Sequence, residues 1–302
     1  MNFMDYMYLH YFTRDLGFPF FIQYGYHDYD MSEHFHYDFH ELVIVLNGTA
    51  THIINSEETF IKKGDVFVFN EGTPHGYKAP CNFKIINIMY KPERMIEVGN
   101  DLKKSSGYQA LFVLEPFFRK DHRFSNTLSL PISSLEYVAE LGANINEEYK
   151  KMHQGYQTMI YSHFMEMVVY LSRQYDIQNK YAVNNFMNLA KAISFMEDNY
   201  LNPIKLEELA AKANLSVRHF NRIFKENYRT TPIDYIIKLR LNHACFLLKK
   251  SKFCITEIAV ESGFDDSNYF TRQFRKYIGI TPKEYRKNYQ LDIHCQHRLN
   301  FD

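Results

Sequence analysis

The spacing of hydrophobic and polar residues changes once along the chain. Up to about residue 95, the apolar residues form short runs, at 42–46, 66–69 and 83–90, that are rich in β-branched and aromatic side chains. Asn47-Gly48 and Gly64-Asp65, which lie beside these runs, are turn signals. Short strands with frequent turns and no intervening helices are typical of an antiparallel sandwich or barrel, so we expect one of these two folds in this part of the chain.

From about residue 135 the apolar residues recur at helical spacing. Two such stretches, 135–145 and 159–171, flank Gly155 and predict a helical hairpin. The polar residues 176–180 indicate a linker, and the pattern from 185 to 290 predicts helices throughout. The expected organisation is a β-rich domain over 1–132, a hairpin over 133–176, a linker over 177–184, an all-α domain over 185–290 and a tail over 291–302.

The all-α part contains an internal repeat. The motif Phe-x3-Phe-x6-Thr-Pro-x2-Tyr occurs twice, at an offset of 50 residues. Upstream of it, Ala210 lies four residues before Asn214, and Ala259 lies four before Gly263. A small residue lets one helix cross closely over another, and Gly or Asn accepts the left-handed backbone of a tight turn. Each copy is therefore predicted to be a helix-turn-helix, although duplication of a purely structural unit would leave the same repeat.

The second helix of each copy has an apolar side and a polar side. The polar sides carry Arg218, Asn221, Arg222 and Lys225 in the first copy, and Asn268, Thr271, Arg272, Arg275 and Lys276 in the second. In the major groove, Arg can bind guanine bidentately and Asn can bind adenine. An ordinary solvated face is the alternative for either helix alone, but two such helices behind two turns favour DNA. The amphipathic helix that begins at Pro232 would hold them about one DNA turn, ~34 Å, apart.

The overall charge hides an asymmetry. The 302 residues contain 35 Lys and Arg and 35 Asp and Glu, a balance that by itself argues against a nucleic-acid-binding protein. Residues 1–183, however, contain 16 basic and 22 acidic side chains, a balance of −6, whereas residues 184–302 contain 19 and 13, a balance of +6. The basic part is the one with the helical repeat, so charge and motif indicate the same partner.

The sequence offers no sign of a membrane or a secretory pathway. No apolar run approaches the ~18 residues needed to span a bilayer, and the first residues lack the basic and small-residue features of a secretory signal. We therefore expect a cytoplasmic protein with no membrane partner. The four cysteines, Cys81, Cys245, Cys254 and Cys295, form neither a metal-binding nor a disulfide pattern, and we expect buried free thiols.

Residues 185–289 resemble the double helix-turn-helix domain of the AraC/XylS family of bacterial transcription regulators. The resemblance is carried by 255–259, Ser262-Gly263-Phe264, Asn268-Tyr269-Phe270, Phe274-Arg275-Lys276 and 279–286. It implies that Arg218, Asn221, Arg222, Asp266, Ser267, Asn268 and Arg272 contact bases and that Thr271 contacts phosphate. Lys205 departs from the family, which prefers Ser or Thr there as a helix cap, and this weakens one helix start.

The N-terminal part is similar to the cupin-like sensor domains of the same family. Residues 38–42 with Gly48 match one half of that small barrel, and 64–75 match the other. Segments 111–116 and 122–124 resemble the rhamnose-responsive activators in particular, as does the pattern at Arg218, Arg222, Asp266 and Asn268. The resemblance implies an α+β two-domain fold, with a cupin-like β-barrel and helical hairpin followed by an all-α double helix-turn-helix.

Two kinds of site remain open inside the barrel. His34, His36, Glu41 and Gly48 fit the first cupin motif, and His75 lies where the second supplies a ligand, so three histidines and a carboxylate could hold Fe, Mn, Ni or Zn. Such a metal would indicate a metal-dependent cupin enzyme fused to a DNA-binding domain. Regulators of this family usually carry a similar segment without metal, and we therefore expect no cofactor. We expect instead a site for a polyhydroxylated effector, formed by His36, Glu41, His52, His75 and Tyr77.

The sequence thus predicts a sequence-specific DNA-binding transcription regulator, an activator and not an enzyme. Its expected partners are double-stranded DNA, a small-molecule effector such as a sugar, RNA polymerase and a second copy of the chain, bound through the hairpin near 133–175. The effector would act through a difference in affinity between two arrangements of the chain. A ligand-independent architectural protein is a third hypothesis, because it would bind DNA without being stabilised by any small molecule.

Overall fold

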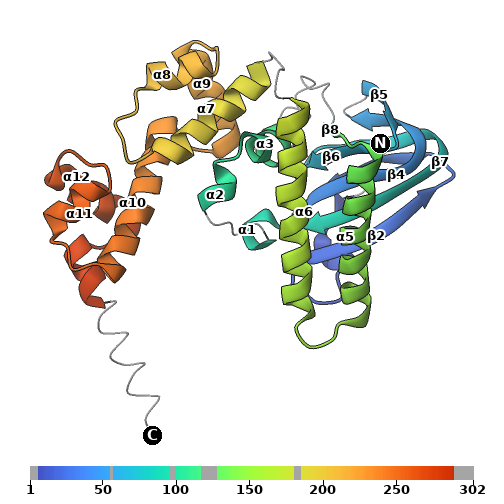
Figure 1. Ribbon diagram of the computed structural model, residues 1–302, viewed down its shortest axis with the longest axis horizontal. Coiled ribbons are helices and arrows are strands. Elements are labelled where there is room, and N and C mark those ends of the chain that lie inside the picture. The colour runs from blue at the N-terminus through green and yellow to red at the C-terminus, as the bar shows by residue number, and fades with distance from the viewer. Residues whose placement is uncertain (1–5, 55–56, 96–99, 117–127, 180–184, 289–302) are drawn as a thin grey trace, which may run out of the picture. The chain divides into compact units, whose positions relative to one another are not determined.

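The structure is a computed structural model that falls into two compact units. It describes residues 6–54, 57–95, 100–116, 128–179 and 185–288. The units are Met1–Lys191 and Ala192–Asp302, and each is described by itself. The first is a sheet with helices on it and the second is entirely helical (Figure 1), so the α+β two-domain fold that the sequence predicts is confirmed.

The first unit is built on an eight-stranded sheet. The strands are β1 (Tyr6–Met7), β2 (Phe20–His27), β3 (Met31–His36), β4 (His40–Ile54), β5 (Glu57–Lys62), β6 (Asp65–Phe69), β7 (His75–Tyr90) and β8 (Leu128–Ser129). The order β1-β3-β7-β4-β6-β8 forms one path, with β2 also paired to β7 and β5 also paired to β4. All pairs are antiparallel except β1 with β3.

The long strands β4 and β7 form the middle of the sheet. They pair from His40 opposite Tyr90 to Ile54 opposite His75, with register shifts between Val45 and Thr51 that bend the pair. At this bend Gly48 has φ +75°, and a Cβ there would lie 2.2 Å from the carbonyl oxygen of residue 82. The prediction that Asn47-Gly48 ends a strand is therefore wrong, because the strand continues through these residues as a bulge.

The sheet has one face turned inward and one covered by helices. Along β4, Val43 and Val45 belong to the inner hydrophobic cluster, together with Phe67 and Phe83. The alternate residues face the helices α5 (Ile132–Lys151) and α6 (Tyr156–Gln178), which lie side by side against the sheet in Figure 1. Gly142 of α5 makes a close approach possible, since a Cβ there would lie 2.7 Å from Cδ1 of Ile86.

The helical hairpin predicted from the sequence corresponds to α5 and α6. Helix α6 ends at Gln178, so helix occupies the first two residues of the expected linker, whereas 180–184 and the expected tail lie outside the described residues. Segment 122–124 also lies outside them. The shorter helices of this unit are η1 (Leu9–Tyr11), α1 (Pro92–Met95), α2 (Asn100–Lys103), α3 (Ser106–Tyr108) and the π-helical turn η2 (Gln109–Leu114).

The second unit consists of two helix-turn-helix modules joined by one long helix. Its helices are α7 (Asn185–Asn199, of which 192–199 belong to this unit), α8 (Leu206–Lys212), α9 (Val217–Tyr228), α10 (Pro232–Lys250), α11 (Ile255–Glu261) and α12 (Ser267–Ile278), followed by a helix over 282–288. Modules α8–α9 and α11–α12 correspond to the two sequence repeats. Thr231 caps α10, and Pro232 occupies its first turn.

The two turns have the same backbone design. Asn214 has φ 55° and Gly263 has φ +81°, so both take the left-handed conformation that the sequence predicts. The residue after each turn residue donates its backbone N–H to the alanine before the turn, Leu215 to Ala210 and Phe264 to Ala259, both at 2.9 Å. The two turns therefore share a left-handed residue and the same closing hydrogen bond.

No helix in the described ranges is both long and apolar enough to cross a membrane. Among the cysteines, Cys81 and Cys254 are exposed and Cys245 is partly buried, so the expectation of buried thiols is wrong for the first two. Cys295 lies outside the described residues.

Candidate functional site: a buried histidine cluster and two recognition helices

Three neighbouring strands bring the predicted barrel residues together. Strand β3 carries His34 and His36, β4 carries Glu41 and His52, and β7 carries His75 and Tyr77. The register places His34 opposite His75, and His52 opposite Tyr77. All six side chains are buried, with His34 the most exposed at 7%. The set predicted from the sequence is thus assembled inside the sheet.

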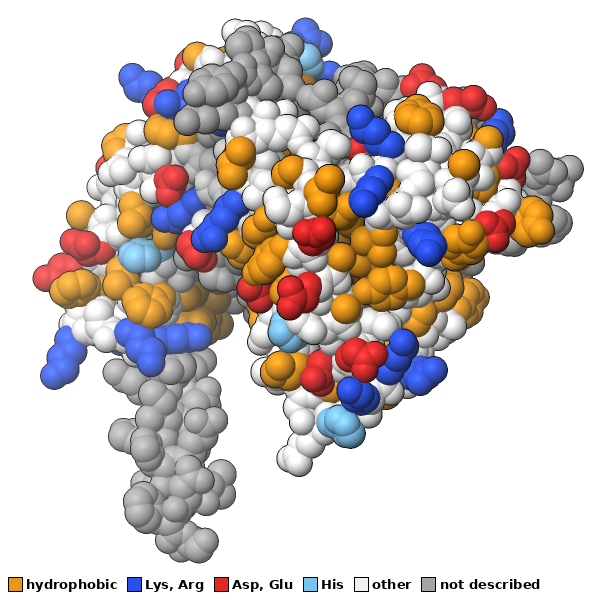
Figure 2. Space-filling view, turned by 45° about the vertical axis from the view of Figure 1, so that its right-hand side comes forward, with side chains coloured by type: hydrophobic (Ala, Val, Ile, Leu, Met, Phe, Trp, Pro, Cys, Tyr) orange, Lys and Arg blue, Asp and Glu red, His pale blue; other side chains and the backbone are white. Residues whose placement is uncertain are grey.

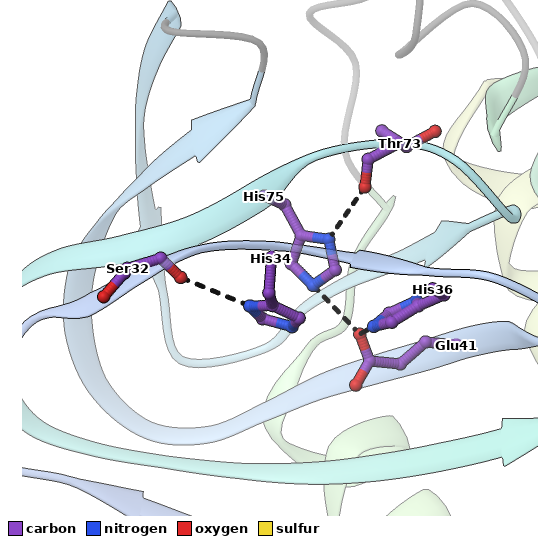
Figure 3. A network of polar contacts seen from close by, with 6 residues as sticks. All are labelled: Ser32, His34, His36, Glu41, Thr73 and His75. Carbon is purple, nitrogen blue, oxygen red and sulfur yellow. Dashed lines mark hydrogen bonds and ion pairs between the residues drawn. The ribbon is translucent and has the colours of Figure 1, made fainter. Parts of the chain in front are cut away.

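Glu41 is the polar centre of this cluster (Figure 3). Its Oε2 lies 3.1 Å from Nε2 of His75 and 3.5 Å from Nε2 of His36. The Nδ1 atoms of His75 and His34 each lie 3.3 Å from a backbone carbonyl, of Thr73 and Ser32 respectively. A carbonyl can only accept, so Nδ1 of His34 carries a proton, and in the neutral ring its Nε2 is then an acceptor. The Glu41 carboxylate also can only accept, so Nε2 of His75 is the donor of the 3.1 Å contact. The carboxylate and the acceptor nitrogens suit a ligand with hydroxyl groups or a cation.

Burial sets the charge of the cluster. Burial outweighs the attraction of Glu41 and lowers the pKa of His36 to about 3, so this ring is neutral at physiological pH. Burial also acts to raise the pKa of Glu41, but the surrounding histidines and the hydrogen bond from His75 outweigh it and lower that pKa to about 2. A buried carboxylate beside a neutral imidazole is a strong acceptor for hydroxyl donors.

Aromatic rings hold the imidazoles in place. The His75 ring stacks on Phe69 with centroids 4.1 Å apart, and the His36 ring stacks on Phe39 at 4.4 Å. His52 stacks on Tyr77 at 5.1 Å, and its centroid lies 6.0 Å from that of His75. The predicted effector residues are thus connected, because the His52 ring, stacked on Tyr77, also contacts the His75 ring beside Glu41.

The same residues offer a donor set that a metal ion could use. One ligand nitrogen from each of His34, His36 and His75 lies within 4.8 Å of the others. Bonds of about 2.1 Å to a tetrahedral ion would place the nitrogens about 3.4 Å apart, so these side chains would have to move inward. The carbonyl contacts of His34 and His75 are of the kind that orient metal-bound histidines. The residues therefore fit a divalent transition metal after a modest rearrangement.

A surface cavity of about 510 Å³ was not predicted from the sequence. Its lining includes Asp38, Lys91 and Arg94. The Asp38 carboxylate pairs with Nζ of Lys91 at 2.7 Å and accepts the backbone N–H of Leu9 at 2.9 Å. Asp38 thereby ties the segment around η1 to the start of β4. Only tertiary structure brings these side chains together, so the sequence pattern gives no signal for them.

Helices α9 and α12 present equivalent positions on their outer faces. The 50-residue offset aligns Arg218 with Asn268, Asn221 with Thr271, and Arg222 with Arg272. Arg218, Arg222, Asp266, Asn268 and Arg272 are exposed, and Asn221, Ser267 and Thr271 are partly exposed. The opposite faces bury Phe220 and Phe224 in α9, and Phe270 and Phe274 in α12. All eight residues predicted to bind DNA therefore lie on or directly before the two second helices.

Two family matches cover the two units. A family described as an AraC-like ligand binding domain matches residues 19–150, and one described as a helix-turn-helix domain matches residues 209–288. The chain belongs to the AraC family. The HTH-type transcriptional activator RhaR of Mannheimia succiniciproducens is 26% identical over 253 residues, covering 84% of this chain and 86% of that protein.

Other relatives agree with this assignment. The HTH-type transcriptional activator RhaS of Citrobacter koseri is 29% identical over 252 residues, covering 83% of this chain and 86% of its own. A solved transcriptional regulator from Chromobacterium violaceum with an AraC-type DNA-binding domain is 33% identical, covering 34% of this chain and 91% of that one, at a TM-score of 0.32. The AraC-family chain is thus a DNA-binding transcription regulator with a ligand-binding domain, like these named activators.

Several residues that are predicted to bind DNA have partners within their own helix. The Arg222 guanidinium donates to both oxygens of Glu226, at 3.0 and 3.2 Å, and that of Arg272 lies 6.0 Å over the Tyr269 ring. The Thr271 hydroxyl donates to the Ser267 carbonyl at 2.8 Å. These contacts hold the side chains against the helix surface, and DNA would have to compete with them.

Some side chains of this unit cap helices, a role separate from the contacts with DNA that the sequence predicts. Asp266 caps α12 by accepting the backbone N–H of Tyr269 at 2.7 Å. Cys254 caps α11 in a capping box with Glu257. Lys205 precedes α8 without a side-chain cap, as its departure from the family pattern predicts. An Asp directly before a helix is a recognised cap signal, so the role of Asp266 was accessible from the sequence.

Proposed function

We propose that this AraC-family regulator is an activator that binds a sugar-like effector in the Glu41 cluster and binds DNA as a dimer through α9 and α12. The observation that carries the proposal is the buried, ionised Glu41 beside neutral His36 in the same chain as two matched recognition helices. Its activity would be regulation of transcription in the cytoplasm and not catalysis.

DNA binding would use two successive major grooves. Arg218, Asn221 and Arg222 would read one subsite, and Asp266, Ser267, Asn268 and Arg272 the other, with Thr271 on phosphate. Substituting Arg222→Ala should weaken binding by about 1–3 kcal/mol, mostly at one base position. Lys225→Ala, one turn further on the same exposed face, is the matched control and should weaken binding equally for all sequences. Fluorescence anisotropy on single-base variants of the site distinguishes them, and an equal loss on all sequences for Arg222→Ala would contradict base reading.

The effector would bind through hydroxyl groups. Glu41 and His36 supply acceptors, His75 supplies a donor, and the edges of the His52 and Tyr77 rings, which stack on each other, complete the lining. The names RhaR and RhaS, together with the resemblance to rhamnose-responsive activators, favour a sugar of this type.

A thermal-shift screen of the full chain with sugars and sugar acids, including rhamnose, tests this site. A ligand at one hundred times its dissociation constant should stabilise the protein by about 2.7 kcal/mol. Glu41→Gln should abolish the shift, and Glu58→Gln, a carboxylate exposed on β5, should leave it intact. The proposal fails for this site if a stabilising sugar acts equally on Glu41→Gln.

Metal analysis tests the other use of the cluster. A metal site is the second candidate function of the cluster, and it is favoured by the positions of the side chains of His34, His36, Glu41 and His75. One transition-metal ion per purified chain, lost in His34→Gln together with a measured turnover, would support a metal-dependent enzyme and overturn the non-enzymatic assignment. Binding of sugar by metal-free protein supports the regulator.

Dimerisation is assigned to the helical hairpin. Figure 2 shows hydrophobic side chains gathered on the face that carries this hairpin, and Ile132, Met159 and Ile177 of α5 and α6 are exposed. Met159→Asp should weaken the dimer in sedimentation analysis, whereas Phe60→Asp, equally apolar and exposed on β5, should not. Equal dimer strength in both variants would argue against the hairpin as the dimer interface. Activation would be measured separately, as effector-dependent transcription with purified RNA polymerase.

A further inference from the structure

Residues of the connecting helix α10 contact both helix-turn-helix modules, and the turn of the second module also packs directly on the loop before the first. We propose that Arg240 and the Asp234–Tyr277 pair are positioning residues that lock the two modules into one rigid reader, so that the protein tolerates only one spacing between its two DNA subsites. The inference rests on the proposed function in one respect, namely that α9 and α12 read two subsites of one DNA duplex.

Arg240 lies in the middle of α10 and contacts both modules. Its Nε donates to the carbonyl of Tyr200 at 2.6 Å, and its Nη2 donates to the carbonyl of Asn202 at 2.8 Å. These carbonyls belong to the loop that leads into α8, at the start of the first module. On its other side the guanidinium lies 5.8 Å from the ring of Phe264, in the turn of the second module. One half-buried side chain thus joins the two.

The backbones of the two modules also meet at this place. A Cβ on Gly263 would lie 2.6 Å from the carbonyl oxygen of Leu201 and 2.9 Å from Nε of Arg240. The turn of the second module therefore packs directly on the loop before the first, with the guanidinium beside the contact. Rotation of one module about α10 would break these contacts.

The far end of α12 is held by a second contact. The Tyr277 hydroxyl donates to Asp234 Oδ1 at 2.7 Å, while Asp234 Oδ2 accepts the hydroxyl of Thr231, the cap of α10, at 2.8 Å. Nζ of Lys238 lies 5.9 Å from the centroid of the Tyr277 ring. The recognition helix α12 is thus fixed near its C-terminal end to the start of α10, where the first module ends.

The length of α10 shows why such contacts matter for DNA. A helix of 19 residues is about 28 Å long, and a bend of about 10° would displace one end by about 5 Å. That displacement exceeds the rise of about 3.4 Å between successive base pairs. A single unbraced helix therefore does not fix the register of two recognition helices to one base pair, whereas contacts at both ends of α12 do.

The test is binding of the full chain to DNA with altered subsite spacing. A binding site is first selected from random DNA with the wild-type protein and then made with one base pair added or removed between the subsites, and with either subsite scrambled. Fluorescence anisotropy compares wild type with Arg240→Met, Tyr277→Phe and the double variant. Lys250→Met, an exposed side chain at the end of the same helix, is the control.

We expect wild type and the control to lose at least tenfold in affinity when the spacing changes by one base pair. The double variant should lose threefold or less, while its affinity for DNA with one subsite scrambled stays within twofold of wild type. Tyr277→Phe removes a single hydroxyl, so it keeps the test valid if Arg240→Met does not fold.

The outcomes separate this inference from the proposed function. The proposal is wrong if a change of spacing costs Tyr277→Phe, and any Arg240→Met variant that folds, as much DNA affinity as it costs wild type. Loss of affinity for every DNA by the same factor would also overturn it, because that result indicates a general structural role. If the selection with wild type recovers only one subsite, the two-groove proposal itself is wrong.

Discussion

Substitution of Gly263 by alanine should disrupt the second helix-turn-helix far more than the matched change disrupts the first. At φ +81° a residue with a Cβ pays about 1–2 kcal/mol for the left-handed backbone. The added Cβ would also lie 2.6 Å from the carbonyl oxygen of Leu201, and overpacking of this kind costs about 1–3 kcal/mol. The sum is about 2–5 kcal/mol, concentrated on α11 and α12.

Asn214 supplies the matched control at the equivalent turn. Its φ of 55° is also left-handed, but it already carries a Cβ, so Asn214→Ala adds no atom to the turn. It should lose only the tolerance of Asn for this conformation, about 1 kcal/mol or less. The comparison therefore isolates the steric contact at Gly263 from the backbone conformation that both turns share.

Hydrogen exchange of the full chain, followed by mass spectrometry, measures the opening free energy of each module separately. In Gly263→Ala, peptides from α11 and α12 should exchange about 30- to 5,000-fold faster, while peptides from the barrel keep the wild-type rate. Asn214→Ala should accelerate peptides from α8 and α9 about fivefold at most. An acceleration in Gly263→Ala no larger than that in Asn214→Ala would refute the packing that we describe.

Three further outcomes follow from the caps and the buried cluster. The folded protein keeps His36 neutral because its pKa is lowered from 6.5 to about 3. The contribution of His36 to the free energy of unfolding is therefore full above about pH 6.5 and falls as the pH drops toward 3. At pH 5 the loss is about 2 kcal/mol. In urea unfolding, His36→Gln should remove that part of the difference between pH 7.5 and pH 5, and an unchanged difference would show that His36 is not the group responsible. Lys205→Ser creates a capping box with Glu208 and should stabilise α8 by about 1 kcal/mol, seen as slower exchange of its amides. Asp266→Asn keeps the cap on α12 whereas Asp266→Ala loses about 1 kcal/mol, so a change of base preference in the stable Asn variant would reveal direct reading by the carboxylate.

Local features were largely accessible from the sequence. The left-handed turns at Asn214 and Gly263 follow from residue type, and the apolar sides of α9 and α12 follow from helical periodicity. The exposed side of each helix follows from the same periodicity, which is why the predicted recognition residues lie together. Periodicity does not predict the contact between the modules, because the Arg240 side chain binds Tyr200 and Asn202, which lie about 40 residues away in the chain.

The barrel was harder to predict because its pairing is non-local. Asn47-Gly48 is a turn signal by itself, but pairing with β7 carries β4 straight through it and uses the Gly48 conformation for a bulge. The candidate effector residues were expected as one group. The way their rings stack, with His52 on Tyr77 and His75 on Phe69, is not encoded by any spacing along the chain.

The β4–β7 pair places the interior of the sensor and its helical exterior on opposite sides of the same two strands. Glu41 faces the cluster, and the next residue, Leu42, is buried on the other face; similarly Ile85 faces inward and Ile86 meets α5. Under the proposed function, the residues that would contact the effector and the residues that pack on the helices therefore alternate along the same strands. Substitution of the inward set would then change ligand choice while the outward set, packed on the helices, stays unchanged.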